Sequence, residues 1–118
     1  MQRGSLLDAE SGAVVVAHVL RTTNPWDRLR GLIGRPPPGD DEGLLLDPCG
    51  SIHTAFMAYA IDAVHLDHAL TVTRVVTALE PWRASFAPGA RLTLELAAGS
   101  AARHALVPGR RLRWQRGS

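Results

Sequence analysis

The sequence of 118 residues contains no lysine, a single cysteine and few aromatic residues, and it has no long hydrophobic run. A single Cys49 excludes an internal disulfide. The longest apolar runs, residues 13–17 and 55–61, are far shorter than the roughly 18 residues that a membrane-spanning helix needs. The N-terminal segment lacks the apolar core of a signal peptide. We therefore expect a cytoplasmic protein that does not cross a membrane.

The chain also lacks a large excess of charge of either sign. The chain has 13 arginines and 11 acidic residues, which gives a formal net charge of +2, too small an excess to indicate nucleic-acid binding by itself. Arginines cluster only in residues 110–116. This cluster could be a basic patch for nucleic acid, but its alternation with Leu112 and Trp114 is equally typical of an edge strand protected by charge. We therefore do not expect nucleic acid as a partner.

The composition that is present suits one globular domain. Hydrophobic residues make up 46% of the chain and charged residues 20%, which excludes a disordered or fibrous protein. The length predicts a single domain over residues 1–118. Because the chain holds 11 glycines and 8 prolines, long helices are not expected.

Short strands dominate the predicted secondary structure. Runs rich in leucine and β-branched residues predict hairpins and single strands, at residues 6–20, 43–47, 61–79, 91–96 and 110–114. In the fourth of these runs, Arg91, Thr93 and Glu95 alternate with three leucines. This alternation predicts a strand with one buried face and one wet face.

Two short helices are expected between the strands. Thr23 or Asn24 can cap a short helix that begins at Pro25 and ends at Gly34. We expect the helix to dock by one apolar face, which carries Trp26, Leu29, Leu32 and Ile33. A second short helix is predicted in AAGSAARHAL. With about six or seven strands and these helices, the predicted fold class is α+β and mainly β, a small curled sheet or barrel.

Four sequence blocks occur in the order RLRGLIGR, EGLLL, CGSIHTAFMAYAID with VHLD, and LELAAGSAARHALVPG. This series resembles the family called Domain of Unknown Function 192 over about residues 24–114. The resemblance implies a small bacterial or archaeal protein with a β-rich, barrel-like α+β domain, no established activity and no known cofactor. The chain departs from the family pattern at Ala60, His65 and Arg110, where proline, an aromatic residue and aspartate are usual. The last change puts in doubt any function that needs an acid there.

Residues 49–68 gather the cysteine, three histidines and two carboxylates. Residues 52–59 fit either a helix or a strand, but Asp62 shares a predicted strand face with Val64 and Leu66 and should be at least half buried. A buried carboxylate needs partners. We expect them to come from His53, from the hydroxyls of Ser51 and Thr54, or from backbone N–H groups of the SIHT turn.

Two interpretations of these polar groups remain open. They form either a structural knot that fixes the loop or a pocket for a small ligand or peptide. The leading functional hypothesis is a binding or accessory module, a monomer or weak homodimer, whose candidate ligand-binding residues are Ser51, His53, Thr54, Met57 and Asp62.

An enzyme is the alternative. A small hydrolase-like protein could use Cys49, activated by His53, or His53 itself, but no third group stands at a supporting spacing. A metal site is not expected either, since the spacing of the candidate ligands matches no known signature and strand alternation points them to opposite faces. Those candidate ligands are His53, Asp62, His65, Asp67 and His68.

Overall fold

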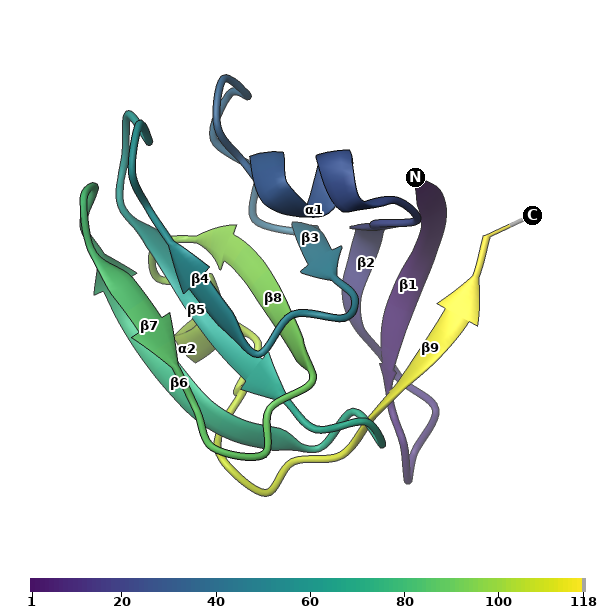
Figure 1. The fold of residues 1–118 in the computed structure, drawn as a ribbon. Coiled ribbons are helices and arrows are strands. Elements are labelled where there is room, and N and C mark those ends of the chain that lie inside the picture. Colours follow the sequence, from purple (N-terminus) through teal and green to yellow (C-terminus); the bar gives the residue numbers. More distant parts are fainter. Residues whose placement is uncertain (118) are drawn as a thin grey trace.

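The computed structural model describes residues 1–117, which form nine strands and two short helices (Figure 1). The mainly β α+β fold that the sequence predicts is confirmed, and two very short strands bring the number above the six or seven expected. The elements are β1 (Gln2–Asp8), β2 (Val14–Arg21), α1 (Pro25–Arg30), β3 (Glu42–Leu46), β4 (Ser51–His53), β5 (Ile61–Leu66), β6 (Val72–Leu79), β7 (Ala84–Phe86), β8 (Leu92–Ala97), α2 (Ser100–Arg103) and β9 (Leu112–Arg116).

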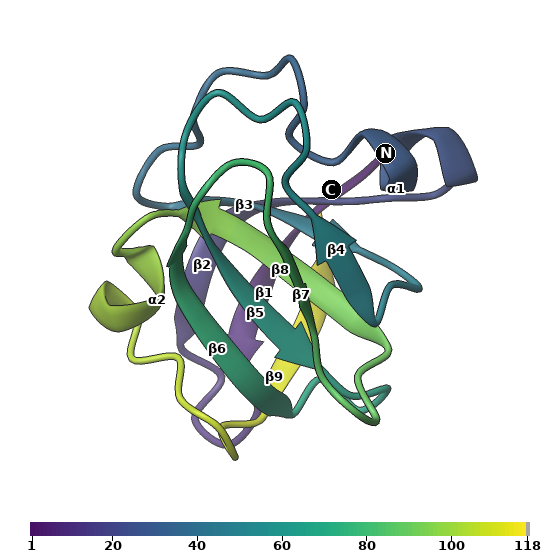
Figure 2. The same ribbon diagram turned by 60° about the vertical axis from the view of Figure 1, so that its left-hand side comes forward.

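Seven strands form one mixed sheet in the order β6-β5-β8-β3-β2-β1-β9, and β4 and β7 form a separate two-stranded sheet. Within the large sheet, β2 and β3 pair in parallel and the other neighbours are antiparallel. The sheet curls until its edge strands approach at one end (Figure 2), where Thr71 and Arg111 form a single bridge. It is not closed into a barrel, so the curled sheet is the correct one of the two predicted forms.

Strand alternation divides the core between the two faces of the large sheet. On one face, here called the α2 face, Leu45, Val64 and Leu94 pack in a cluster that also includes Ala101 of α2. On the opposite face, here called the β4 face, a second cluster contains residues of β3 and β5 together with Ile52 of β4. The small sheet and the loop after α1 therefore cover a face that would otherwise meet solvent.

This cover corrects the prediction of a wet face on β8. Thr93 and Glu95 are 0% and 3% exposed, because both side chains point to the β4 face. His65 is buried beside them, with Nδ1 3.0 Å from Thr93 Oγ1 and Nε2 2.8 Å from Ser85 Oγ. Since the Thr93 hydroxyl donates to the Cys49 carbonyl, it accepts from His65, so Nδ1 of this ring carries a proton. Burial, followed by the charge of Arg74, lowers the pKa of His65.

Helix α1 begins as predicted but does not dock as predicted. Asn24 accepts a hydrogen bond from the Asp27 N–H at 2.9 Å, which caps the helix. The expectation that Trp26 and Leu29 pack on the core is wrong, because they are 80% and 63% exposed. The helix also ends at Arg30, and Leu32, in the loop beyond it, is the buried side chain. An apolar helix surface is thus left beside β4.

The C-terminal strand lies at an edge of the large sheet, as its alternating arginines suggested. Arg110, one of the departures from the pattern that the resemblance implies, places its guanidinium 3.3 Å from the Asp8 carboxylate. It also donates to the His104 and Ala105 carbonyls. Arg110 therefore links β1 to the segment after α2. Among residues 1–117, no helix is long and apolar enough to span a membrane.

Candidate functional site

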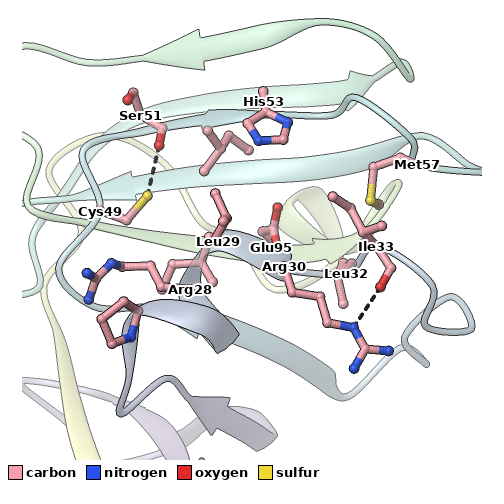
Figure 3. A pocket seen from close by; sticks show the side chains of 14 residues that line it. Arg28, Leu29, Arg30, Leu32, Ile33, Cys49, Ser51, His53, Met57 and Glu95 are labelled. Atoms are coloured by element: carbon pink, nitrogen blue, oxygen red, sulfur yellow. Dashed lines mark hydrogen bonds between the residues drawn. The ribbon is translucent and has the colours of Figure 1, made fainter.

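A pocket of about 390 Å³ lies between α1 and β4 (Figure 3). This volume is at the lower end of the roughly 300–1,000 Å³ typical of small-molecule sites. One wall is formed by Leu29 of α1 with Leu32 and Ile33 of the following loop, and the opposite wall is β4. Glu95 of β8 lies between the two walls. The lining is mostly apolar, so this carboxyl group is its most unusual feature.

Glu95 is buried without a full set of hydrogen bonds. Its Oε1 has no hydrogen-bond partner among the residues that the structure describes. Burial raises the pKa of this carboxyl group from 4.5 to about 7, and the backbone N–H of Leu32 offsets part of that rise. At neutral pH the group therefore exists in both protonation states.

Gly31 explains how the loop can approach this carboxyl group so closely. Its φ of +53° lies in the left-handed region, where a side chain would be strained. A Cβ at this position would also lie only 2.8 Å from Glu95 Oε1. Glycine thus allows the loop after α1 to shield Glu95 from solvent.

Thr54, one of the predicted ligand-binding residues, is fully buried and does not line the pocket. Its hydroxyl donates to the Glu80 carbonyl at 2.6 Å and accepts from the Arg83 N–H at 2.8 Å. Its carbonyl accepts from the N–H groups of Met57 and Trp82. Thr54 therefore joins the turn after β4 to the turn before β7, and its role is structural.

Asp62 is fully buried, as predicted, but its partners are not those expected. Its Oδ1 accepts from the Ala78 N–H at 2.9 Å, and its Oδ2 accepts from the N–H groups of Gly99 and Ala101, each at 3.0 Å. The predicted knot with His53 is wrong because Asp62 points to the α2 face, whereas β4 covers the opposite face. Asp62 instead anchors the start of α2.

Three of the predicted site residues, Ser51, His53 and Met57, line the pocket, whereas Thr54 and Asp62 do not. Sequence reasoning missed Glu95 because the alternation in RLTLELA places it opposite the leucines, a position that is normally wet. Only the knowledge that a second sheet covers that face identifies it. The one sequence signal was an acid in a strand with leucines on both sides.

Cys49 lies at the edge of the pocket, where its thiol donates to the Ser51 carbonyl at 2.8 Å (Figure 3). Burial raises the pKa of this thiol, and the nearby Glu95 charge acts in the same direction. A raised pKa keeps the group protonated and unreactive, so the geometry does not support an activated nucleophile.

We expect Cys49 to react more slowly with iodoacetamide at pH 7 in the folded protein than in the same protein unfolded in urea. The thiolate is the attacking species, and a raised pKa lowers its population about tenfold per unit. Mass spectrometry of the alkylated fraction over time measures both rates. Equal rates in the two states would show that the thiol is neither shielded nor perturbed.

The candidate metal ligands do not come together. Across residues 1–117, no group of three or more His, Cys, Asp and Glu side chains is arranged to hold a metal ion. His65 faces Thr93 and Ser85, whereas Asp67 accepts backbone N–H groups of its own turn. These side chains are used within the fold.

The architecture is that of a small, mainly β domain with a curled mixed sheet, one face of which is covered by a two-stranded sheet. The chain belongs to the family DUF192, described as an uncharacterized ACR, whose sequence pattern matches residues 7–114. The match extends the predicted region, about residues 24–114, to include β2 and the end of β1.

Two crystal structures share this fold. One is a protein of Sinorhizobium meliloti 1021 that carries a provisional assignment as a transcription regulator; it is 24% identical, with a TM-score of 0.80 over 96% of this chain and 92% of the other. The second is a protein of unknown function from Novosphingobium aromaticivorans DSM 12444, 21% identical, with a TM-score of 0.75 over 95% of this chain and 84% of the other. No curated protein matches this chain in sequence.

Proposed function

We propose that the domain is a binding module whose pocket between α1 and β4 takes a ligand with an apolar body and a hydrogen-bond donor. The observation that carries this proposal is the unpartnered Oε1 of Glu95 among apolar side chains. Ser51, His53 and Met57 contribute to the opposite wall. We place the module in the cytoplasm, in agreement with its sequence.

The energetics favour such a ligand. A buried oxygen that has lost water without gaining a partner costs about 1–3 kcal/mol, and a donor supplied by a ligand recovers part of that cost. Burying the apolar body adds about 25 cal/mol for each Å² removed from water. The exposed Leu29 of α1 loses solvent contact only when something occupies the pocket. Both terms require an amphiphilic ligand.

We expect Leu29→Asp to weaken the binding of 3-methylbutan-1-ol, an apolar probe with one hydroxyl donor, by about tenfold or more. The substitution places a charge on an apolar wall, and a tenfold loss corresponds to about 1.4 kcal/mol. Because Leu29 is 63% exposed, the fold should be unaffected. Chemical-shift titration by NMR gives the dissociation constants.

The matched control is Val107→Asp, which changes an apolar residue that is 57% exposed and lies outside the pocket. This variant should bind the probe as the parent protein does. If the two variants bind it equally well, the pocket beside α1 is not the binding site.

A further inference from the structure

Within residues 1–117, one edge of β4 carries no partner strand. The two-stranded sheet of β4 and β7 places Ile52 opposite Ser85 and His53 opposite Ala84. The next residue, Thr54, donates its N–H to the Arg83 carbonyl at 2.8 Å. In an antiparallel ladder, hydrogen-bonded pairs alternate with non-bonded pairs. Thr54 and Ile52 therefore direct their backbone groups to β7, whereas His53 and Ser51 direct theirs away from it.

The thiol of Cys49 supports this orientation. It donates to the Ser51 carbonyl (Figure 3), which places that oxygen on the pocket side of β4, where Cys49 also lies. His53 follows two residues later on the same strand and has the same backbone orientation. Its N–H and C=O thus form an open donor and acceptor pair on the side of β4 that faces α1.

We infer that the ligand of this pocket is an extended peptide segment of another protein, which adds a strand to the open edge of β4. The inference rests on the proposed function, because it names the class of ligand for the same pocket. A peptide strand exchanges two main-chain hydrogen bonds with His53, as in other cases of strand addition to a sheet edge. The free backbone pair and the pocket beside it are both used by this ligand.

The same register indicates which side chain enters the pocket. Ile52 is 7% exposed and belongs to the core cluster beneath β4, so a peptide residue opposite it points its side chain the same way. That side chain meets the apolar lining and Glu95. Tyrosine, tryptophan and lysine combine an apolar body with a donor at the tip, and we expect one of them at this position.

A second copy of the chain is a poorer occupant of the edge. The pocket is lined by both α1 and β4, and helix α1 lies on the side of β4 away from β7 (Figure 2). Two paired β4 edges would each bring a helix α1 to the same side, whereas a single extended segment brings none.

The test uses acetylated and amidated peptides Thr-Thr-Xaa-Thr-Thr, in which Xaa is leucine, tyrosine, tryptophan or lysine, with 3-methylbutan-1-ol as the pocket probe. NMR titration gives the affinities, and amide hydrogen exchange follows the His53 N–H. We expect at least one donor-bearing peptide to bind more tightly than the leucine peptide and to slow exchange at His53. N-methylation of one threonine next to Xaa should weaken binding about tenfold or more.

N-methylation of Xaa itself is the matched control, because its N–H points away from β4 and should matter little. If the alcohol binds but no peptide protects His53, or if all N-methylated peptides bind alike, strand addition is wrong and the pocket proposal survives. If neither alcohol nor peptide binds, the proposed function itself fails. Concentration-dependent protection of His53 without peptide would assign the edge to a second copy and overturn the inference.

Discussion

Asp62→Ala is expected to destabilise the protein by about 4 kcal/mol, because hydrogen bonds to a charged group contribute about 1.5–3 kcal/mol each and the freed N–H groups stay buried. The carboxylate accepts three backbone N–H groups, from Ala78, Gly99 and Ala101, in a fully buried position. Such a loss is large against the roughly 5–15 kcal/mol stability of a typical domain. Urea unfolding followed by circular dichroism measures it.

Two further variants sharpen this test. Asp62→Asn keeps the shape but turns an NH₂ group toward N–H donors, so it should also be strongly destabilising. Asp40→Ala is the matched control, because its side chain is 79% exposed and its ion pair with Arg103 is a surface contact worth about 0–1 kcal/mol. An Asp62→Ala protein that is as stable as the Asp40→Ala protein would contradict the assigned role.

His53→Ala should behave differently from Asp62→Ala. His53 is exposed in the pocket and shares no hydrogen bond with Asp62. We therefore expect a small change in stability, within about 0.5 kcal/mol. The two changes should be additive in the double variant, whereas a structural knot between these side chains would make them strongly coupled.

Glu95→Gln is expected to stabilise the folded protein at pH 8 by about 3 kcal/mol relative to the parent, and to have little effect at pH 4.5. The pKa of Glu95 rises from 4.5 in the unfolded chain to about 7 in the folded protein, and each pH unit between them corresponds to about 1.36 kcal/mol. Because the folded state holds this proton more tightly, the contribution of Glu95 is most favourable below pH 4.5. It is lost as pH rises through 7.

Urea unfolding of the two proteins at several pH values measures this difference. His65 acts in the opposite direction, since burial lowers its pKa from 6.5 and its contribution is lost as pH falls below that value. Both proteins contain His65, so its effect cancels in the comparison. Glu80→Gln, at an exposed carboxyl, is the matched surface control. A Glu95→Gln profile parallel to that of the parent would mean that Glu95 is solvated.

Local signals in the sequence predicted much of the fold. The cap at Asn24, the hairpins and the alternating leucines of β8 depend on neighbouring residues, and the structure confirms each of them. The burial of Asp62 was also predicted correctly, because alternation along β5 fixes the face of each side chain. Alternation does not predict which backbone groups donate hydrogen bonds to Asp62. In the structure, two of the three belong to the segment at the start of α2.

The candidate site depended on contacts between distant parts of the chain, and these were predicted less well. Glu95 is buried because β4, β7 and the loop at Gly31 cover its face, and no local pattern contains that information. The exposure of Trp26 and Leu29 has the same origin. The periodicity of α1 predicts an apolar surface, but only the tertiary structure shows that this surface borders a pocket.

The most direct test of the pocket is a carbon-13 NMR titration of the Glu95 side-chain carboxyl group, recorded with and without 3-methylbutan-1-ol. The account predicts a midpoint at about pH 7 in the free protein and a clear change in the carboxyl resonance when the alcohol is added. A midpoint near the ordinary 4.5 that does not respond to the alcohol would contradict it.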